Sequence, residues 1–126
     1  MSAVYLYINS ALYLIFAVWC TVGMSRTAPG MGFTALAPGG RSEYLSIYGG
    51  LQVGLAIAFW LLARNPSWHG SGILFSIALY APIVLFRLVS VARFWPVGTV
   101  TLGTAVLEVV LLAVALWLYF SRPGTH

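Results

Sequence analysis

Two ionisable residues, Arg87 and Glu108, stand inside long apolar stretches of a 126-residue sequence. A carboxylate beside a guanidinium can hold a polar ligand or exchange a proton, because burial and a neighbouring charge both displace the pKa of a carboxyl group. The same two side chains can instead form a buried ion pair that only fixes the register of two helices. Both alternatives require that neither residue face lipid, where each would cost about 2.5–3.5 kcal/mol.

Three further residues extend the candidate site. Glu43 precedes the second apolar stretch, and the hydroxyl groups of Tyr48 and Tyr80 can donate hydrogen bonds into a pocket. Most of the charge is expected in one half of the bundle, beneath the first and third loops. The candidate residues for a polar pocket or ion pair are Glu43, Tyr48, Tyr80, Arg87 and Glu108.

Several classes of function lack support. The sequence has no Cys-x-x-Cys and no His-Glu-x-x-His, and His69 and His126 have no partner at ligand spacing. We therefore expect no metal and no cofactor, assign no catalytic residue, and favour a protein that is not an enzyme. The net charge of +4 comes from arginines spread one or two per loop, which is typical of membrane flanks and not of a nucleic-acid surface.

The elements that carry these residues are predicted from hydrophobicity and length. The chain is 61% hydrophobic and 6% charged, and its apolar stretches cover residues 4–24, 44–63, 72–92 and 97–120. About 20 residues in a helix cross the hydrocarbon of a bilayer. The sequence predicts an all-α fold, one integral membrane domain of four antiparallel transmembrane helices over residues 1–126.

The connections between these helices differ in length. The first loop, residues 25–43, is long and rich in proline and glycine, whereas the other two are tight turns. The second, third and fourth helices should therefore pack as sequential antiparallel neighbours, while the first helix stands apart on its long loop.

Steps of three and four residues predict which helix faces point inward. On the third helix the inward stripe is Ser76, Tyr80, Ile83, Arg87 and Ser90. On the fourth it is Thr101, Ala105, Glu108, Leu112 and Ala115. On the second, small residues that allow close helix approach form a packing seam of Ser46, Gly50, Gly54 and Ala58.

Aromatic residues are expected to anchor both membrane interfaces. They are Tyr5, Tyr7, Trp60, Trp68, Trp117 and Tyr119 on the side of the termini, and Trp19, Tyr44, Phe94 and Trp95 on the other side. Arginines predict orientation, with Arg26, Arg41 and Arg93 in the first and third loops against Arg64 and Arg122. Because cytoplasmic loops carry the excess of basic residues, these two loops are predicted to be cytoplasmic.

The run SEYLSIYGGL, residues 42–51, followed by a lone Arg87 and a lone Glu108 in later helices, resembles a bacterial family of unknown function within the DoxX-like group. The resemblance extends over the whole chain through the order and length of its helices. It implies a small four-helix protein of the bacterial inner membrane. It also draws attention to Glu43, Tyr48, Gly49, Gly50, Arg87 and Glu108, but it implies no activity.

Two functions remain open. The first is an accessory or assembly subunit that lies in the lipid bilayer and packs against a membrane-protein partner or a second copy of itself. The alternative is a pocket protein that binds, moves or isomerises a small hydrophobic ligand with a buried pair of Arg87 and Glu108.

Overall fold

The computed structural model describes residues 1–121, and all of their regular structure is helical. The helices are α1 (Ser2–Val22), α2 (Met24–Gly30), α3 (Pro38–Leu45), the π-helix η1 (Ser46–Leu51), α4 (Gln52–Arg64), the short 3-10 helix η2 (Pro66–Trp68), α5 (His69–Arg93) and α6 (Thr99–Phe120). Four spans, Ser2–Val22, Pro38–Arg64, Pro66–Arg93 and Thr99–Phe120, are long and apolar enough to cross a membrane. The predicted all-α fold with four membrane-spanning helices is confirmed. Arg122 and His126 lie outside the described residues.

The second span is longer than predicted, because it begins at Pro38 instead of residue 44. Proline at the first position of a helix has a suitable fixed φ and lacks only an N–H that would be unpaired there anyway. Much of the predicted first loop is therefore helical, as α2 and α3, and only residues 31–37 connect these two helices. Gly32, at a φ of +95°, reverses the chain just after α2.

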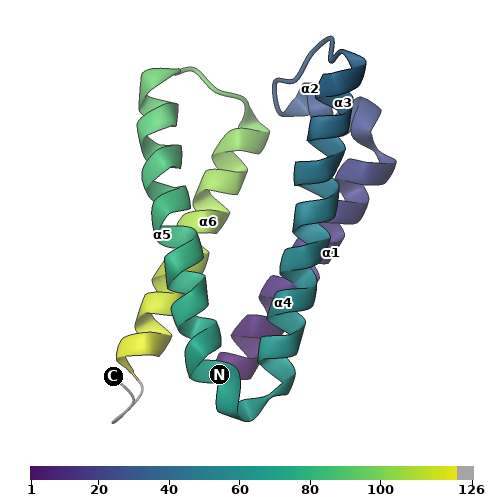
Figure 1. Cartoon of the computed structure of the whole chain (residues 1–126). Coiled ribbons are helices and arrows are strands. Elements are labelled where there is room, and N and C mark those ends of the chain that lie inside the picture. The colour runs from purple at the N-terminus through teal and green to yellow at the C-terminus, as the bar shows by residue number, and fades with distance from the viewer. Residues whose placement is uncertain (122–126) are drawn as a thin grey trace.

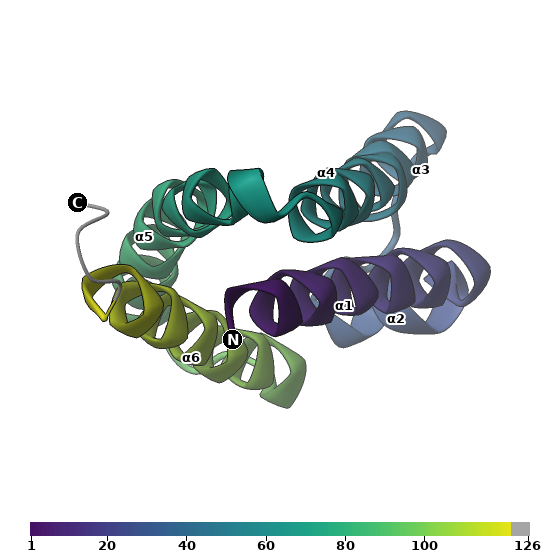
Figure 2. The same ribbon diagram turned by 90° about the horizontal axis from the view of Figure 1, so that it is seen from below.

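The helices form two pairs (Figure 1). One pair is α1 with the continuous helix of α3, η1 and α4, and the other is α5 with α6. The view from below shows the same pairing (Figure 2). The prediction that the first helix stands apart is wrong, because α1 packs along α4 and the Ser10 hydroxyl donates a hydrogen bond to the Ala56 carbonyl at 2.7 Å. Closing a longer loop costs little free energy, so loop length did not decide the neighbours.

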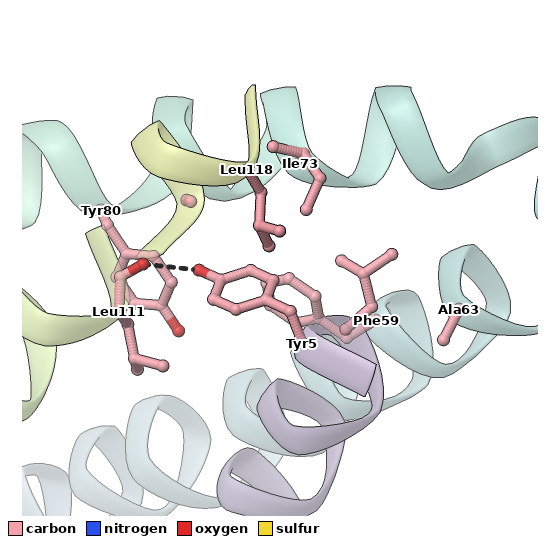
Figure 3. Packing of buried hydrophobic residues seen from close by; sticks show 9 residues of the cluster. Tyr5, Phe59, Ala63, Ile73, Tyr80, Leu111 and Leu118 are labelled. Atoms are coloured by element: carbon pink, nitrogen blue, oxygen red, sulfur yellow. Dashed lines mark hydrogen bonds between the residues drawn. The ribbon is translucent and has the colours of Figure 1, made fainter. Parts of the chain in front are cut away.

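The main hydrophobic core lies toward the end of the bundle that carries the N-terminus, where the two pairs converge (Figures 1 and 3). Its buried residues include Tyr5 of α1, Phe59 of α4, Ile73 of α5 and Leu118 of α6. The Tyr5 hydroxyl donates to the Leu111 carbonyl at 2.8 Å and so joins the two pairs. Tyr5 was predicted at the membrane interface, and this is wrong because its side chain is almost fully buried.

A second cluster of buried residues, Cys20, Ala28 and Tyr44, lies near the other end and holds the first loop. The Tyr44 and Thr27 hydroxyl groups are hydrogen-bonded at 2.8 Å, which ties α3 to α2. Tyr44 is therefore a core residue and not the interfacial anchor that was predicted. The predicted anchors Trp19, Trp60, Trp68, Trp95 and Trp117 are all exposed on the protein surface, as anchors in lipid would be.

Candidate polar site in the membrane-spanning bundle

Arg87 and Glu108 meet across the hairpin of α5 and α6. The Arg87 Nε donates to Glu108 Oε1 at 2.8 Å, and Nη2 donates to Oε2 at 3.3 Å, so the pair is bidentate. The side chains are 32% and 14% exposed, respectively. A short connection between Arg93 and Thr99 makes the two helices antiparallel neighbours, and both residues lie on the faces that point inward. The fork of a guanidinium matches a carboxylate, which makes this arrangement directional as well as attractive.

A cavity of about 380 Å³ lies between the two helix pairs, and Arg87 and Glu108 form part of its wall. Met31 and Phe33 of the first loop also line it, as does Val100 near the start of α6. The cavity therefore lies in the half of the bundle near the first and third loops. At that end the helix pairs diverge (Figure 1).

The two pairs contribute different side chains to the cavity wall. From α1, the first loop and η1 come four aromatic residues, Tyr13, Phe16, Phe33 and Tyr48. From α5 and α6 come the ion pair and two hydroxyl residues, Thr101 and Thr104, along with Tyr80. Most of the remaining lining is aliphatic. The cavity thus has two unlike walls. We call Tyr13, Phe16, Phe33 and Tyr48 the aromatic wall, and the wall opposite carries the charged side chains of Arg87 and Glu108.

Neighbouring side chains hold the aromatic wall in place. Tyr13 stacks on Phe59 with ring centroids 5.7 Å apart and an interplanar angle of 6°. The Tyr48 ring lies 4.8 Å from that of Tyr44, 5.9 Å from that of Phe33 and 6.2 Å from that of Phe16. Rings that are packed from behind lose little further freedom when a ligand arrives.

Four of the five candidate residues line this cavity, and Glu43 does not. Tyr48 belongs to the aromatic wall, while the Tyr80 hydroxyl donates to Asn9 Oδ1 in the buried interior. Glu43 is exposed, because Tyr44, one position and about 100° further around the helix, takes the buried place. The predicted grouping of Glu43 with Glu108 is thus corrected.

The predicted inward stripes on the last two helices agree with the structure. Ser76 and Tyr80 of α5 and Ala105 and Ala115 of α6 are buried, and the other members of both stripes are partly buried. The regular α-helical steps hold in these two helices even though Pro82 lies inside α5.

The small-residue seam does not pack within the chain. Ser46, Gly50 and Gly54 are exposed, Ala58 is partly buried, and a Cβ at Gly50 or Gly54 would meet no atom within 4 Å. The close approach occurs at Gly49 instead, where a Cβ would lie 2.8 Å from the Thr21 Oγ1 of α1. The cause is η1, since the i→i+5 hydrogen bonds of a π-helix widen each turn and displace a face that was counted in steps of four.

Sequence reasoning missed most of the aromatic wall. Asn9, Tyr13, Phe16 and Cys20 follow steps of four, three and four, and all four are buried or partly buried. The same periodicity that identified the faces of α5 and α6 would have identified this inward face of α1. No comparable signal exists for Phe33, which lies in the irregular segment 31–37.

Comparisons of the chain with protein-family models, with curated proteins and with solved structures find no match. The resemblance to the DoxX-like group stays a prediction, as does the expectation that no metal or cofactor is bound.

Proposed function

We propose that this protein binds a small, largely apolar and uncharged molecule in the cavity between its helix pairs. The observation that carries the proposal is the bidentate pair of Arg87 and Glu108 in the wall of a 380 Å³ cavity. An ion pair in the wall of a cavity can contact a molecule inside it as well as hold two helices in register. Ligand sites in proteins are typically about 300–1,000 Å³, mostly apolar, with a few polar groups that orient the ligand.

The charge of the cavity argues for an uncharged ligand. Its lining holds one positive and one negative side chain, which are already paired with each other. A charged ligand would have to leave water without finding a free counter-charge, and that desolvation costs several kcal/mol. An uncharged group can instead hydrogen-bond to the pair and leave it intact.

The test is to fill the cavity and look for loss of a bound molecule. Leu55 of α4 and Ile83 of α5 line the cavity, whereas Ile57 and Leu85, two positions further along each helix, are exposed. Native mass spectrometry of the purified protein should detect a small bound molecule that is lost in Leu55→Trp and Ile83→Trp. Ile57→Trp and Leu85→Trp are the matched controls and should retain it. Equal occupancy in the filled and control variants would refute the proposal.

Removing both charges distinguishes a pair that binds a ligand from a pair that only holds the helices together. In the double variant Arg87→Leu/Glu108→Leu neither charge is left unpaired, so assembly should survive. Glu108→Gln keeps the shape of the side chain but removes its charge. If the double variant folds and retains its bound molecule and its activity in the host, the pair is structural and the pocket mechanism is wrong. Loss of the molecule with assembly intact is the expected result.

A second candidate is the accessory subunit that packs against a membrane partner or a second copy of the chain. It is favoured by the exposed face with Ser46, Gly50 and Gly54, which lies open to the surroundings of the bundle. Gly54→Leu should then abolish co-purification of a partner, while Val53→Leu, on an adjacent exposed position, should not. If neither change alters what co-purifies, this second candidate is wrong.

The proposal includes the location and orientation of the protein in the membrane. We place the protein in a bacterial inner membrane, as the DoxX-like resemblance implies, with the first and third loops in the cytoplasm. Arg26, Arg41 and Arg93 support this orientation because cytoplasmic loops carry the excess of basic residues. A cysteine introduced at exposed Ser67, in the opposite loop, should react with a membrane-impermeant maleimide added to intact cells once Cys20 is replaced by alanine.

A further inference from the structure

We infer that the cavity selects a flat aromatic ring that carries one uncharged hydrogen-bonding group at its edge. This inference rests on the proposed ligand-binding function and names the chemical class of the ligand. It follows from the unequal walls of the cavity, with aromatic side chains on one side and the ion pair on the other.

The aromatic wall favours a ring over a saturated body of the same size. Tyr48 already contacts Phe16 in a tilted arrangement and Phe33 edge-to-face, with ring centroids 6.2 Å and 5.9 Å apart. A further ring placed against them makes the same kinds of contact, which stabilise aromatic pairs beyond the effect of buried area alone. A saturated ring system of the same size is stabilised only by the burial of its apolar area.

The ion pair favours a hydrogen-bonding group on that ring. A guanidinium has five N–H donors, and Glu108 accepts from two of the Arg87 nitrogens, Nε and Nη2. The remaining N–H groups can donate to a ligand oxygen, and the carboxylate of Glu108 can still accept from a hydroxyl group. A neutral hydroxyl, which both donates and accepts, suits this pair better than a group that does only one.

The cavity volume limits the size of the ring system. A volume of about 380 Å³ lies near the lower end of the range of ligand sites, roughly 300–1,000 Å³, which suits a compact molecule. We therefore expect two or three fused rings with one hydrogen-bonding group at the edge to fit within the space.

The experiment uses aminoanthracene, a neutral fluorescent amine, as the probe, with the full chain in lipid nanodiscs. The specific signal is the fluorescence of the native chain minus that of Leu55→Trp, which carries the same lipid background. Three competitors are then compared: naphthol, its saturated counterpart decalol, and naphthalene, which lacks the hydroxyl group. Naphthol should displace the probe at a concentration about tenfold lower than either of the others.

The outcomes separate this inference from the function on which it rests. If the native chain and Leu55→Trp give the same probe signal, but native mass spectrometry still finds a bound molecule that Leu55→Trp loses, binding stands and the aromatic ligand class is overturned. If neither the probe nor mass spectrometry distinguishes the native chain from Leu55→Trp, the proposed binding function fails. If the probe binds specifically but decalol competes as well as naphthol, binding stands and the aromatic selectivity is overturned. Equal competition by naphthalene would overturn the role assigned to the ion pair.

A variant tests the wall itself. Phe16→Leu/Tyr48→Leu keeps the cavity apolar while removing two rings of the aromatic wall. The preference for naphthol over decalol should fall from about tenfold toward equality in this variant. An unchanged preference would show that these rings do not select the ligand.

Discussion

The Nε of Arg87 lies 2.8 Å from Oε1 of Glu108, and this contact joins α5 to α6 at the edge of a cavity that reaches across to α1 and η1. The Arg87 side chain is 32% exposed and the Glu108 side chain 14%, so neither is sealed from its surroundings. A pair in this position can stabilise the hairpin and also offer hydrogen bonds to a ligand. The stability of the hairpin and the chemistry of the cavity are therefore coupled through the same two side chains.

Removing one member of the pair should destabilise the protein more than removing both. Glu108→Leu leaves the Arg87 charge without its partner, and we expect a loss of about 1–3 kcal/mol in the free energy of unfolding. Arg87→Leu/Glu108→Leu should recover most of that loss. Reversible unfolding in mixed micelles measures it, with Arg93→Leu, an exposed arginine of the same helix, as the control. If the double variant is less stable than Glu108→Leu, the charge argument is wrong.

The buried bond between Tyr80 and Asn9 should contribute measurably to the contact between α1 and α5. Both side chains are almost fully buried, and the Tyr80 hydroxyl donates to Asn9 Oδ1. Tyr80→Phe leaves that oxygen without this donor, and a loss of about 1 kcal/mol is expected from hydrogen bonds between membrane helices. Tyr7→Phe changes an exposed tyrosine of α1 and should have no effect. Equal unfolding free energies for Tyr80→Phe and Tyr7→Phe would contradict the prediction.

The spans could be predicted from the sequence because their apolar length is a direct requirement of the bilayer. The inward faces of α5 and α6 were also predictable, since Arg87, Glu108 and Ser76 are polar residues in regular steps. Because polar side chains strongly avoid lipid, their positions indicate which face of a helix points into the bundle.

The partners of each helix could not be predicted in the same way. In lipid, leucine is as well accommodated outside the protein as inside it, so exposed Leu107 and buried Leu111 carry the same signal in the sequence. Tyr5 and Tyr44 show a related ambiguity, because an aromatic residue near the end of a span suits both an interface and a core. The π-helix η1 also rotates the inward face of the second span, and no residue type in the sequence predicts a π-helix there.

Gly49 and Gly50 should differ in their response to the same change. Gly49→Ala places a methyl group 2.8 Å from the Thr21 Oγ1, whereas Gly50→Ala meets no atom within 4 Å. Overpacking typically costs about 1–3 kcal/mol, so Gly49→Ala should destabilise the contact between α1 and η1. Gly50→Ala should be neutral or slightly stabilising, because alanine favours helix over glycine.

Thr21→Ala provides the rescue for Gly49→Ala, since it removes the oxygen that the new methyl group would meet. The double variant Thr21→Ala/Gly49→Ala should unfold with nearly the free energy of Thr21→Ala alone. A deficit that persists in the double variant would show that the cost of Gly49→Ala arises elsewhere.

Loss of the bond between Tyr44 and Thr27 should loosen the first loop without unfolding the bundle. These hydroxyl groups lie 2.8 Å apart and tie α3 to α2, on either side of the segment 31–37 that carries Phe33 over the cavity. Tyr44→Phe keeps the ring but breaks the tie, so amide hydrogen exchange in residues 24–37 should become faster by about threefold to tenfold, while exchange in α5 stays the same. Because Phe33 packs edge-to-face on the Tyr44 and Tyr48 rings, a looser segment also weakens one part of the aromatic wall. Exchange that rises equally in α5 would mean that the bond supports the whole bundle and not the loop.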